Sequence, residues 1–128
     1  MPHNPVVWFE IYVQDMARAQ RFYESVLQCQ LQPLTPPDSV AGDTTMMAFP
    51  MDMAAPGTGG MLVQMAGVPS GGGGTLVYFG CDDCAQPQGR MLAAGGRIDK
   101  PKFSIGPYGF IALVVDTEGN CVGLHSMQ

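Results

Sequence analysis

The chain alternates short apolar runs with turn-forming residues, and one clear helical pattern stands near its start. Residues 6–13, VVWFEIYV, are apolar, β-branched or aromatic apart from Glu10, which is typical of a buried strand. Asp15 follows as the predicted N-cap of a helix. Over residues 16–28 the apolar side chains recur at helical spacing and predict one stripe along that helix. The stripe consists of Ala19, Phe22, Tyr23, Val26 and Leu27.

Short strands are predicted along the rest of the chain, on both sides of a glycine-rich break. Before the break they cover residues 29–34, 45–50 and 61–65. The break itself, PSGGGG at 69–74, reads as a flexible link that is too short to separate independent domains. After it, the pattern predicts strands at 75–81, 97–100, 110–116 and 121–125. A helix over about 84–94 is expected between them, capped by Asp82 and Asp83 and ended by Gly95 and Gly96.

The predicted order is therefore strand, helix and three strands, repeated once. An internal repeat of this kind determines the architecture. We expect one α+β domain over residues 1–128, made of a first module at about 5–68 and a second module at about 75–126.

Composition excludes several classes of partner. The net charge is −5 and the six basic residues never form a run, which argues against nucleic acid and anionic membrane surfaces. No apolar stretch approaches the roughly 18 residues of a membrane span, and the start of the chain lacks a signal-peptide pattern. Four cysteines in such a chain read as reduced thiols, so a cytoplasmic location is expected. The low charged content of 13% suggests surface buried in a partner, with a homodimer as the default.

Three segments carry a family resemblance. They are YVQDMARAQRFYESVLQ near the start, FGCDDCAQ in the middle, and IGPYGFIALVVDTEGNCVGLHS at the end. Together they resemble the vicinal-oxygen-chelate superfamily of glyoxalases, bleomycin resistance proteins and extradiol dioxygenases. Within the superfamily, the chain resembles single-domain proteins described as lactoylglutathione-lyase-like. The resemblance covers residues 5–126 approximately. It implies that each module curls its part of a mixed sheet into a half-barrel, with a helix outside and a ligand cavity inside.

Strand alternation sorts side chains between those two faces. In the first strand Trp8, Glu10 and Tyr12 should point into the cavity. In the second module the residues expected there are Leu76, Tyr78, Cys121, Gly123 and His125.

The resemblance also implies four metal-binding positions, one on the first and one on the last strand of each module. Here they fall on Trp8, about Gln64, Leu76 and Gly123. A single amide oxygen among four positions cannot hold a metal ion, so we predict no metal and no cofactor. An improvised site of Glu10, His125 and a cysteine is the alternative.

Glu10 is the most informative residue, because a carboxylate inside an apolar strand is costly unless it is paired or useful. It could contact a ligand or act as a general base with His125 or Tyr78, or it could be purely structural. Expected ligand-binding residues are Trp8, Tyr12, Gln64, Tyr78, Tyr108 and Phe110. These choices leave two main hypotheses, a metal-free small-molecule binder with an aromatic cavity and an acid–base lyase or isomerase. A metal-dependent glyoxalase-like lyase that uses the improvised site is a further alternative. The C-x-x-C at 81–84 reads as incidental small buried residues.

Overall fold

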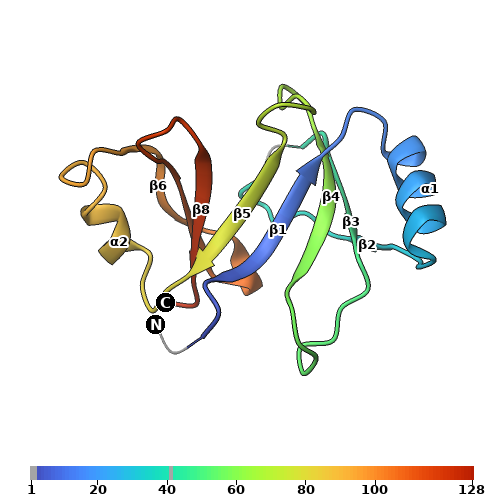
Figure 1. Cartoon of the computed structure of the whole chain (residues 1–128), viewed down its shortest axis with the longest axis horizontal. Coiled ribbons are helices and arrows are strands. Elements are labelled where there is room, and N and C mark those ends of the chain that lie inside the picture. Colours follow the sequence, from blue (N-terminus) through green and yellow to red (C-terminus); the bar gives the residue numbers. More distant parts are fainter. Residues whose placement is uncertain (1–2, 41) are drawn as a thin grey trace. The chain divides into compact units, whose positions relative to one another are not determined.

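The computed structural model describes residues 3–40 and 42–128. The chain folds as two compact units, which are described separately below. Trp8–Thr75 form the N-terminal unit, and Leu76–Gln128 with the residues up to Val7 form the C-terminal unit. Each unit carries a helix and the strands predicted for its module, so the repeated strand–helix–three-strand order is confirmed (Figure 1).

Four strands and one helix build the N-terminal unit. They are β1 (Val6–Tyr12), α1 (Met16–Leu27), β2 (Gln32–Leu34), β3 (Thr44–Ala48) and β4 (Gly59–Met65). The strands lie in the order β2-β3-β4-β1. β1 runs parallel to β4, whereas β4, β3 and β2 are antiparallel neighbours. A parallel pair needs a long crossover, which α1 and the two following strands supply.

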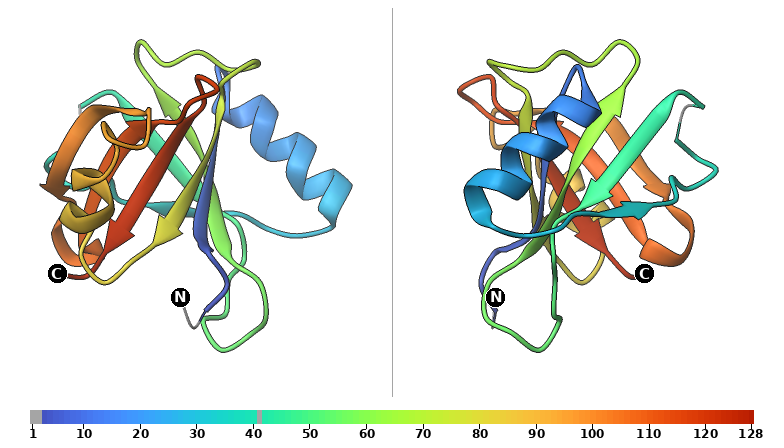
Figure 2. Two further views of the ribbon diagram at one scale, coloured as in Figure 1. Left: turned by 60° about the vertical axis from the view of Figure 1, so that its left-hand side comes forward. Right: turned by 90° about the vertical axis from the view of Figure 1, so that its right-hand side faces the viewer.

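Alternation along β1 divides its side chains between two faces. On the face covered by α1, Val13, Met16, Leu31 and Leu62 form a buried cluster, against which Ile11 packs. Figure 2 shows α1 lying across the strands of this unit. The opposite face, called the inner face below, holds a second cluster. It consists of Met46, Met61 and Val63, with Trp8, Tyr12, Leu34 and Met65 packed against them. The predicted sorting of β1 is therefore confirmed.

Both ends of α1 follow local chemistry. The Asp15 carboxylate accepts from the backbone N–H of Arg18 at 3.1 Å, which confirms the predicted N-cap. Gln28 ends the helix in the left-handed conformation, with φ of 52°. The predicted stripe is only partly buried. Ala19 and Tyr23 pack on the core, whereas three members lie exposed on the surface, namely Phe22, Val26 and Leu27.

The C-terminal unit contains β5 (Thr75–Gly80), α2 (Ala85–Gly89), β6 (Arg97–Ser104), a 3-10 turn η1 (Gly106–Tyr108), β7 (Phe110–Val115) and β8 (Cys121–Ser126). The strands lie in the order β5-β8-β7-β6. β5 and β8 are parallel, and β8, β7 and β6 are antiparallel neighbours. Cys84, Ala112, Val114 and Leu124 form the core on the helix side. The backbone N–H of Gly80 also donates to the carbonyl of Pro5 at 3.0 Å.

Two elements of this unit differ from their predicted bounds. α2 is five residues long and ends at Gly89, because Gln-Pro-Gln-Gly is a poor helix-forming sequence. Gly95 does adopt a positive φ of 96°, but in the turns that follow the helix. β6 continues past Pro101 to Ser104, with register shifts on both sides of Lys100. An edge strand with bulges tolerates proline, since the missing N–H need not pair.

Along residues 3–40 and 42–128, no helix is both long and apolar enough to span a bilayer.

Candidate functional site

Glu10 is the one charged side chain that is buried in the described part of the chain, with 7% of its surface exposed. It lies in the middle of β1 on the inner face, between Trp8 and Tyr12. The Tyr12 hydroxyl donates to its Oε1 at 2.7 Å. A carboxylate taken out of water is costly unless donors compensate it, and a hydrogen bond to a charged group is stronger than a neutral one. The pair therefore forms a polar point within an apolar surface.

The surroundings of this pair are polarisable and adaptable. Met61 on β4 is the neighbour of Glu10 on β1, and Met46 on β3 is the neighbour of Val63 on β4. Thioether side chains fill irregular spaces and contact aromatic rings favourably. The apolar side chains of the inner face can therefore adjust to a flat apolar group, while Glu10 and Tyr12 can orient that group by hydrogen bonding.

His125 belongs to the C-terminal unit and lies half-buried on β8. Its Nε2 is 2.6 Å from the backbone oxygen of Tyr108. Because a carbonyl oxygen only accepts, Nε2 is the donor of this hydrogen bond, and Nδ1 is the ring nitrogen outside it. Tyr108 ends η1 with 45% of its surface exposed. Glu10 and His125 thus sit in different units, and their pairing stays a prediction.

Tyr78 is buried on β5, where its ring lies against the backbone of Gly123 in β8. A Cβ atom at position 123 would overlap Cδ1 and Cε1 of that ring. Gly123 is one of the four positions at which the family resemblance placed a metal ligand. The tyrosine ring occupies the space that a ligating side chain would need.

The other three positions do not supply a metal site either. Trp8 and Leu76 carry no ligating atom, and the carboxamide oxygen of Gln64 accepts from the backbone N–H of Met16 at 2.8 Å. No group of three His, Cys, Asp or Glu side chains that could hold an ion occurs within 3–40 and 42–128. The residues present therefore do not fit the family's metal ion.

Two residues that were expected to contact a ligand, Gln64 and Phe110, lie on the helix-covered face of their own unit. Gln64 is on the face covered by α1, since the register places it one residue from the inner-face position Val63. Phe110 packs against the helix-side core of the C-terminal unit and lies 4.8 Å from Nζ of Lys102, measured to the ring centroid. Gln64 was expected in the cavity from a metal-binding position of the family and Phe110 from its aromatic ring, and neither expectation used the alternation of its strand, which decides the face.

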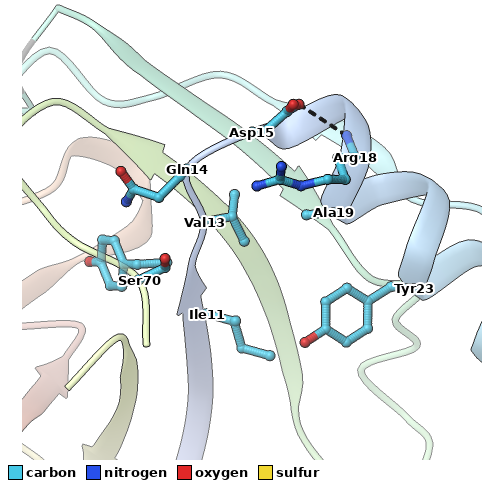
Figure 3. Close-up of a pocket in the computed structure, with 9 residues that line it drawn as sticks. Ile11, Val13, Gln14, Asp15, Arg18, Ala19, Tyr23 and Ser70 are labelled. Atoms are coloured by element: carbon cyan, nitrogen blue, oxygen red, sulfur yellow. Dashed lines mark hydrogen bonds between the residues drawn. The ribbon is translucent and has the colours of Figure 1, made fainter. Parts of the chain in front are cut away.

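A pocket of about 240 Å³ that the sequence did not reveal lies where β1 meets α1 (Figure 3). It is lined by Ile11, Tyr12, Val13, Gln14, Asp15, Arg18, Ala19, Tyr23 and Ser70. All of these residues belong to the N-terminal unit. The helical periodicity placed Ala19 and Tyr23 toward the sheet, but nothing in the sequence pattern indicated that Arg18 and Ser70 would share their rim.

Comparisons with known proteins agree with this architecture. The model of the Glyoxalase/Bleomycin resistance protein/Dioxygenase superfamily matches residues 6–124. No curated protein gives a significant match. Among solved structures, methylmalonyl-CoA epimerase from Mycobacterium tuberculosis has a TM-score of 0.66 at 14% identity, covering 97% of this chain and 88% of that one. A variant of the Streptomyces coelicolor methylmalonyl-CoA epimerase in complex with 2-nitronate-propionyl-CoA has a TM-score of 0.65 at 13% identity, covering 96% of both chains. A hypothetical protein from Bacillus halodurans reaches 0.67 at 12% identity, covering 96% and 94%. At these identities the likeness is one of fold.

Proposed function

We propose that this chain, which belongs to the glyoxalase, bleomycin resistance protein and dioxygenase superfamily, binds a small molecule without a metal ion. The reason is that its inner face carries one buried carboxylate in apolar surroundings. The observation that carries the proposal is the hydrogen bond from Tyr12 to Glu10. It holds the carboxylate at a defined place on a surface whose other side chains are apolar, namely Trp8, Leu34, Val63 and three methionines. Fixed polar groups in an apolar lining are the usual composition of a ligand site.

The chemistry of the inner face favours a planar apolar ligand that carries a hydrogen-bond donor. Trp8 offers a flat surface, and Met61 can adapt to the outline of the ligand. Glu10 accepts hydrogen bonds and favours a neutral or cationic donor over an anion. The net charge of −5 acts in the same direction.

Trp8 is the only tryptophan of the chain, so its fluorescence reports on this face. A matched series on one scaffold would test the proposal, namely a naphthalene bearing an aminomethyl, a hydroxymethyl or a carboxymethyl group. We expect the amine and the alcohol to change Trp8 emission saturably, and the acid to bind at least about tenfold more weakly. The binding should survive prior treatment with a chelator.

The matched variants are Glu10→Gln and Glu118→Gln, which remove one negative charge inside and outside the site. Glu118 lies exposed in the turn before β8. Glu10→Gln should weaken the amine by about tenfold, as expected for a hydrogen bond to a charged group. Equal effects of the two variants, or no saturable change with any member of the series, would refute the proposal.

A second candidate is an isomerase that moves a proton next to a carbonyl group. It is favoured by the same Glu10–Tyr12 pair and by the methylmalonyl-CoA epimerases among the similar structures. Glu10 would remove the proton from the carbon next to a thioester carbonyl, and a second acid such as protonated His125 would donate its own proton to the other face of that carbon. Incubation of a 2-methylacyl thioester in deuterated water, followed by NMR, tests this candidate. Deuterium should enter at that carbon with the parent protein and not with Glu10→Gln.

We further propose that the protein works in the cytoplasm as a homodimer. The low content of charged residues supports an associated state, and the four cysteines support a reducing compartment. Light scattering on the purified protein tests the dimer, since it distinguishes 13.6 kDa from twice that mass.

A further inference from the structure

The pocket between β1 and α1 lies on the opposite side of β1 from the Glu10 side chain, and Tyr12 is the one residue that belongs both to its lining and to the proposed ligand site. Its floor is apolar. Ile11 and Val13 come from the end of the β1 segment, and Ala19 and Tyr23 come from α1. Edge-to-face contact with Phe49, at 5.5 Å between ring centroids, holds the Tyr23 ring in position. This floor can cover a short alkyl chain or a small ring.

The rim adds one cation. Figure 3 shows the Arg18 side chain reaching from α1 toward Val13, with Gln14 beyond it. Among residues 3–40 and 42–128, the ion pair that forms joins Lys102 and Asp83. No carboxylate of these residues therefore pairs with the Arg18 guanidinium. The Gln14 amide is different, because its nitrogen already donates to the carbonyl of Val68 at 3.0 Å. Arg18 is thus the rim group best able to bind a new partner.

The start of α1 is not the source of attraction for an anion. Three of its first four backbone N–H groups already have partners, since Met16 donates to Gln64, and Arg18 and Ala19 donate to Asp15. The Asp15 carboxylate also lines the pocket and opposes an anion. It is turned toward the helix amide in Figure 3, away from Ile11 and Tyr23. Any anion bound here must therefore depend on the guanidinium.

We propose that this pocket binds a small carboxylate with a short apolar tail. The carboxylate pairs with the Arg18 guanidinium, whose planar set of donors matches the two oxygens. The tail lies on Ile11, Val13 and Tyr23. At about 240 Å³ the pocket is below the roughly 300 Å³ at which sites for drug-sized ligands begin, so it selects a ligand of a few carbon atoms.

Hexanoate is the probe for this site, with hexan-1-ol as its uncharged counterpart. Titration into the isotope-labelled protein should shift the backbone amides of residues 11–19 and 70 saturably, and hexanol should bind at least about fivefold more weakly. The matched variants are Arg18→Gln and Arg21→Gln, two exposed α1 arginines of which only Arg18 lines the pocket. Arg18→Gln should weaken hexanoate about fivefold or more, and Arg21→Gln should leave it within about twofold.

Asp15→Asn provides the opposite change. Asparagine caps a helix as well as aspartate does, so α1 should be retained while one repulsive charge is removed. Hexanoate should then bind about two- to fivefold more tightly. Equal binding by the two arginine variants, equal binding of hexanol and hexanoate, or shifts outside the pocket would overturn the proposal. Because Glu10→Gln should leave hexanoate binding unchanged, the result is independent of the proposed function.

Discussion

The ring of Tyr78 lies on the backbone of Gly123, at the place where a side chain on β8 would begin. Position 123 therefore accepts only glycine as long as the ring stays where it is. The same contact removes one of the four positions expected to hold the family's metal ion. The ring of Tyr78 can therefore occupy its buried position because residue 123 has no side chain.

Gly123→Ala should lower the free energy of unfolding by about 1–3 kcal/mol, because the new methyl group would displace a buried ring from its packing. Urea denaturation measures the change. Gly89→Ala is the control, since nothing lies within 4 Å of a Cβ at that position and its φ is not positive. It should be neutral or slightly stabilising. Equal losses in the two variants would mean that Tyr78 moves aside freely.

Tyr12→Phe should destabilise the fold by about 1–3 kcal/mol, because it removes a donor from a buried carboxylate. The loss should be recovered in part by adding Glu10→Gln, since the double variant no longer buries a carboxyl group that lacks its donor. A double-mutant cycle measured by urea denaturation checks this. Tyr108→Phe, at an exposed position, should change stability by less than about 0.5 kcal/mol. Additive effects of the two substitutions at positions 10 and 12 would contradict the coupling.

Gln64→Ala should cost about 0.5–1.5 kcal/mol, because the first N–H of α1 loses its acceptor. The helix should fray at its start, which hydrogen exchange at Met16 can detect. Binding of the naphthalene amine should be unaffected, since Gln64 lies on the face covered by α1. Gln30→Ala, at an exposed position before β2, is the control for loss of a glutamine. A weaker amine complex in Gln64→Ala would restore Gln64 to the ligand site.

The repeat and the sorting of β1 were predictable because each strand follows a period of two and α1 begins at a capping aspartate. Gln64 and Phe110 were expected in the cavity from the family's metal position and from aromatic character, not from alternation, and both lie on the helix side of their own unit. The pocket beside Arg18 was not predictable. It depends on where Ser70, in a glycine-rich link, comes to lie beside the end of β1. Alternation and capping carry no information about such a contact between distant segments.

Acid should weaken the link between α2 and β6. The Asp83 carboxylate accepts from Nζ of Lys102 at 2.8 Å and from the backbone N–H of Ala85 at 2.9 Å. The Lys102 hydrogen bond, followed by that of Ala85, holds the pKa of Asp83 below its usual 3.8. A lowered folded-state pKa stabilises the fold above the unfolded value, and this contribution is lost as the pH falls through the folded value.

The stability difference between the parent protein and Asp83→Asn should therefore be constant at neutral pH and should vanish in strong acid, below the folded pKa. Urea denaturation between about pH 7 and about pH 2 measures it. Asp82→Asn, which removes an equal charge one residue away, separates loss of the ion pair from the change in net charge. A pH-independent difference for Asp83→Asn would show that the ion pair does not stabilise the fold.

The thiols of the C-x-x-C segment should react slowly in the folded protein. Cys84 is fully buried, and its sulfur accepts from the Ser126 hydroxyl at 3.3 Å. Burial raises the pKa of Cys81 above its usual 9.0, and the neighbouring Cys84, Asp83 and Asp82 raise it further. Because the thiolate is the reactive form, a Cys29→Ser/Cys121→Ser variant should react with a disulfide reagent at pH 8 at least about tenfold more slowly folded than unfolded. Rapid formation of a bond between Cys81 and Cys84 under a mild oxidant would instead identify the segment as a redox pair.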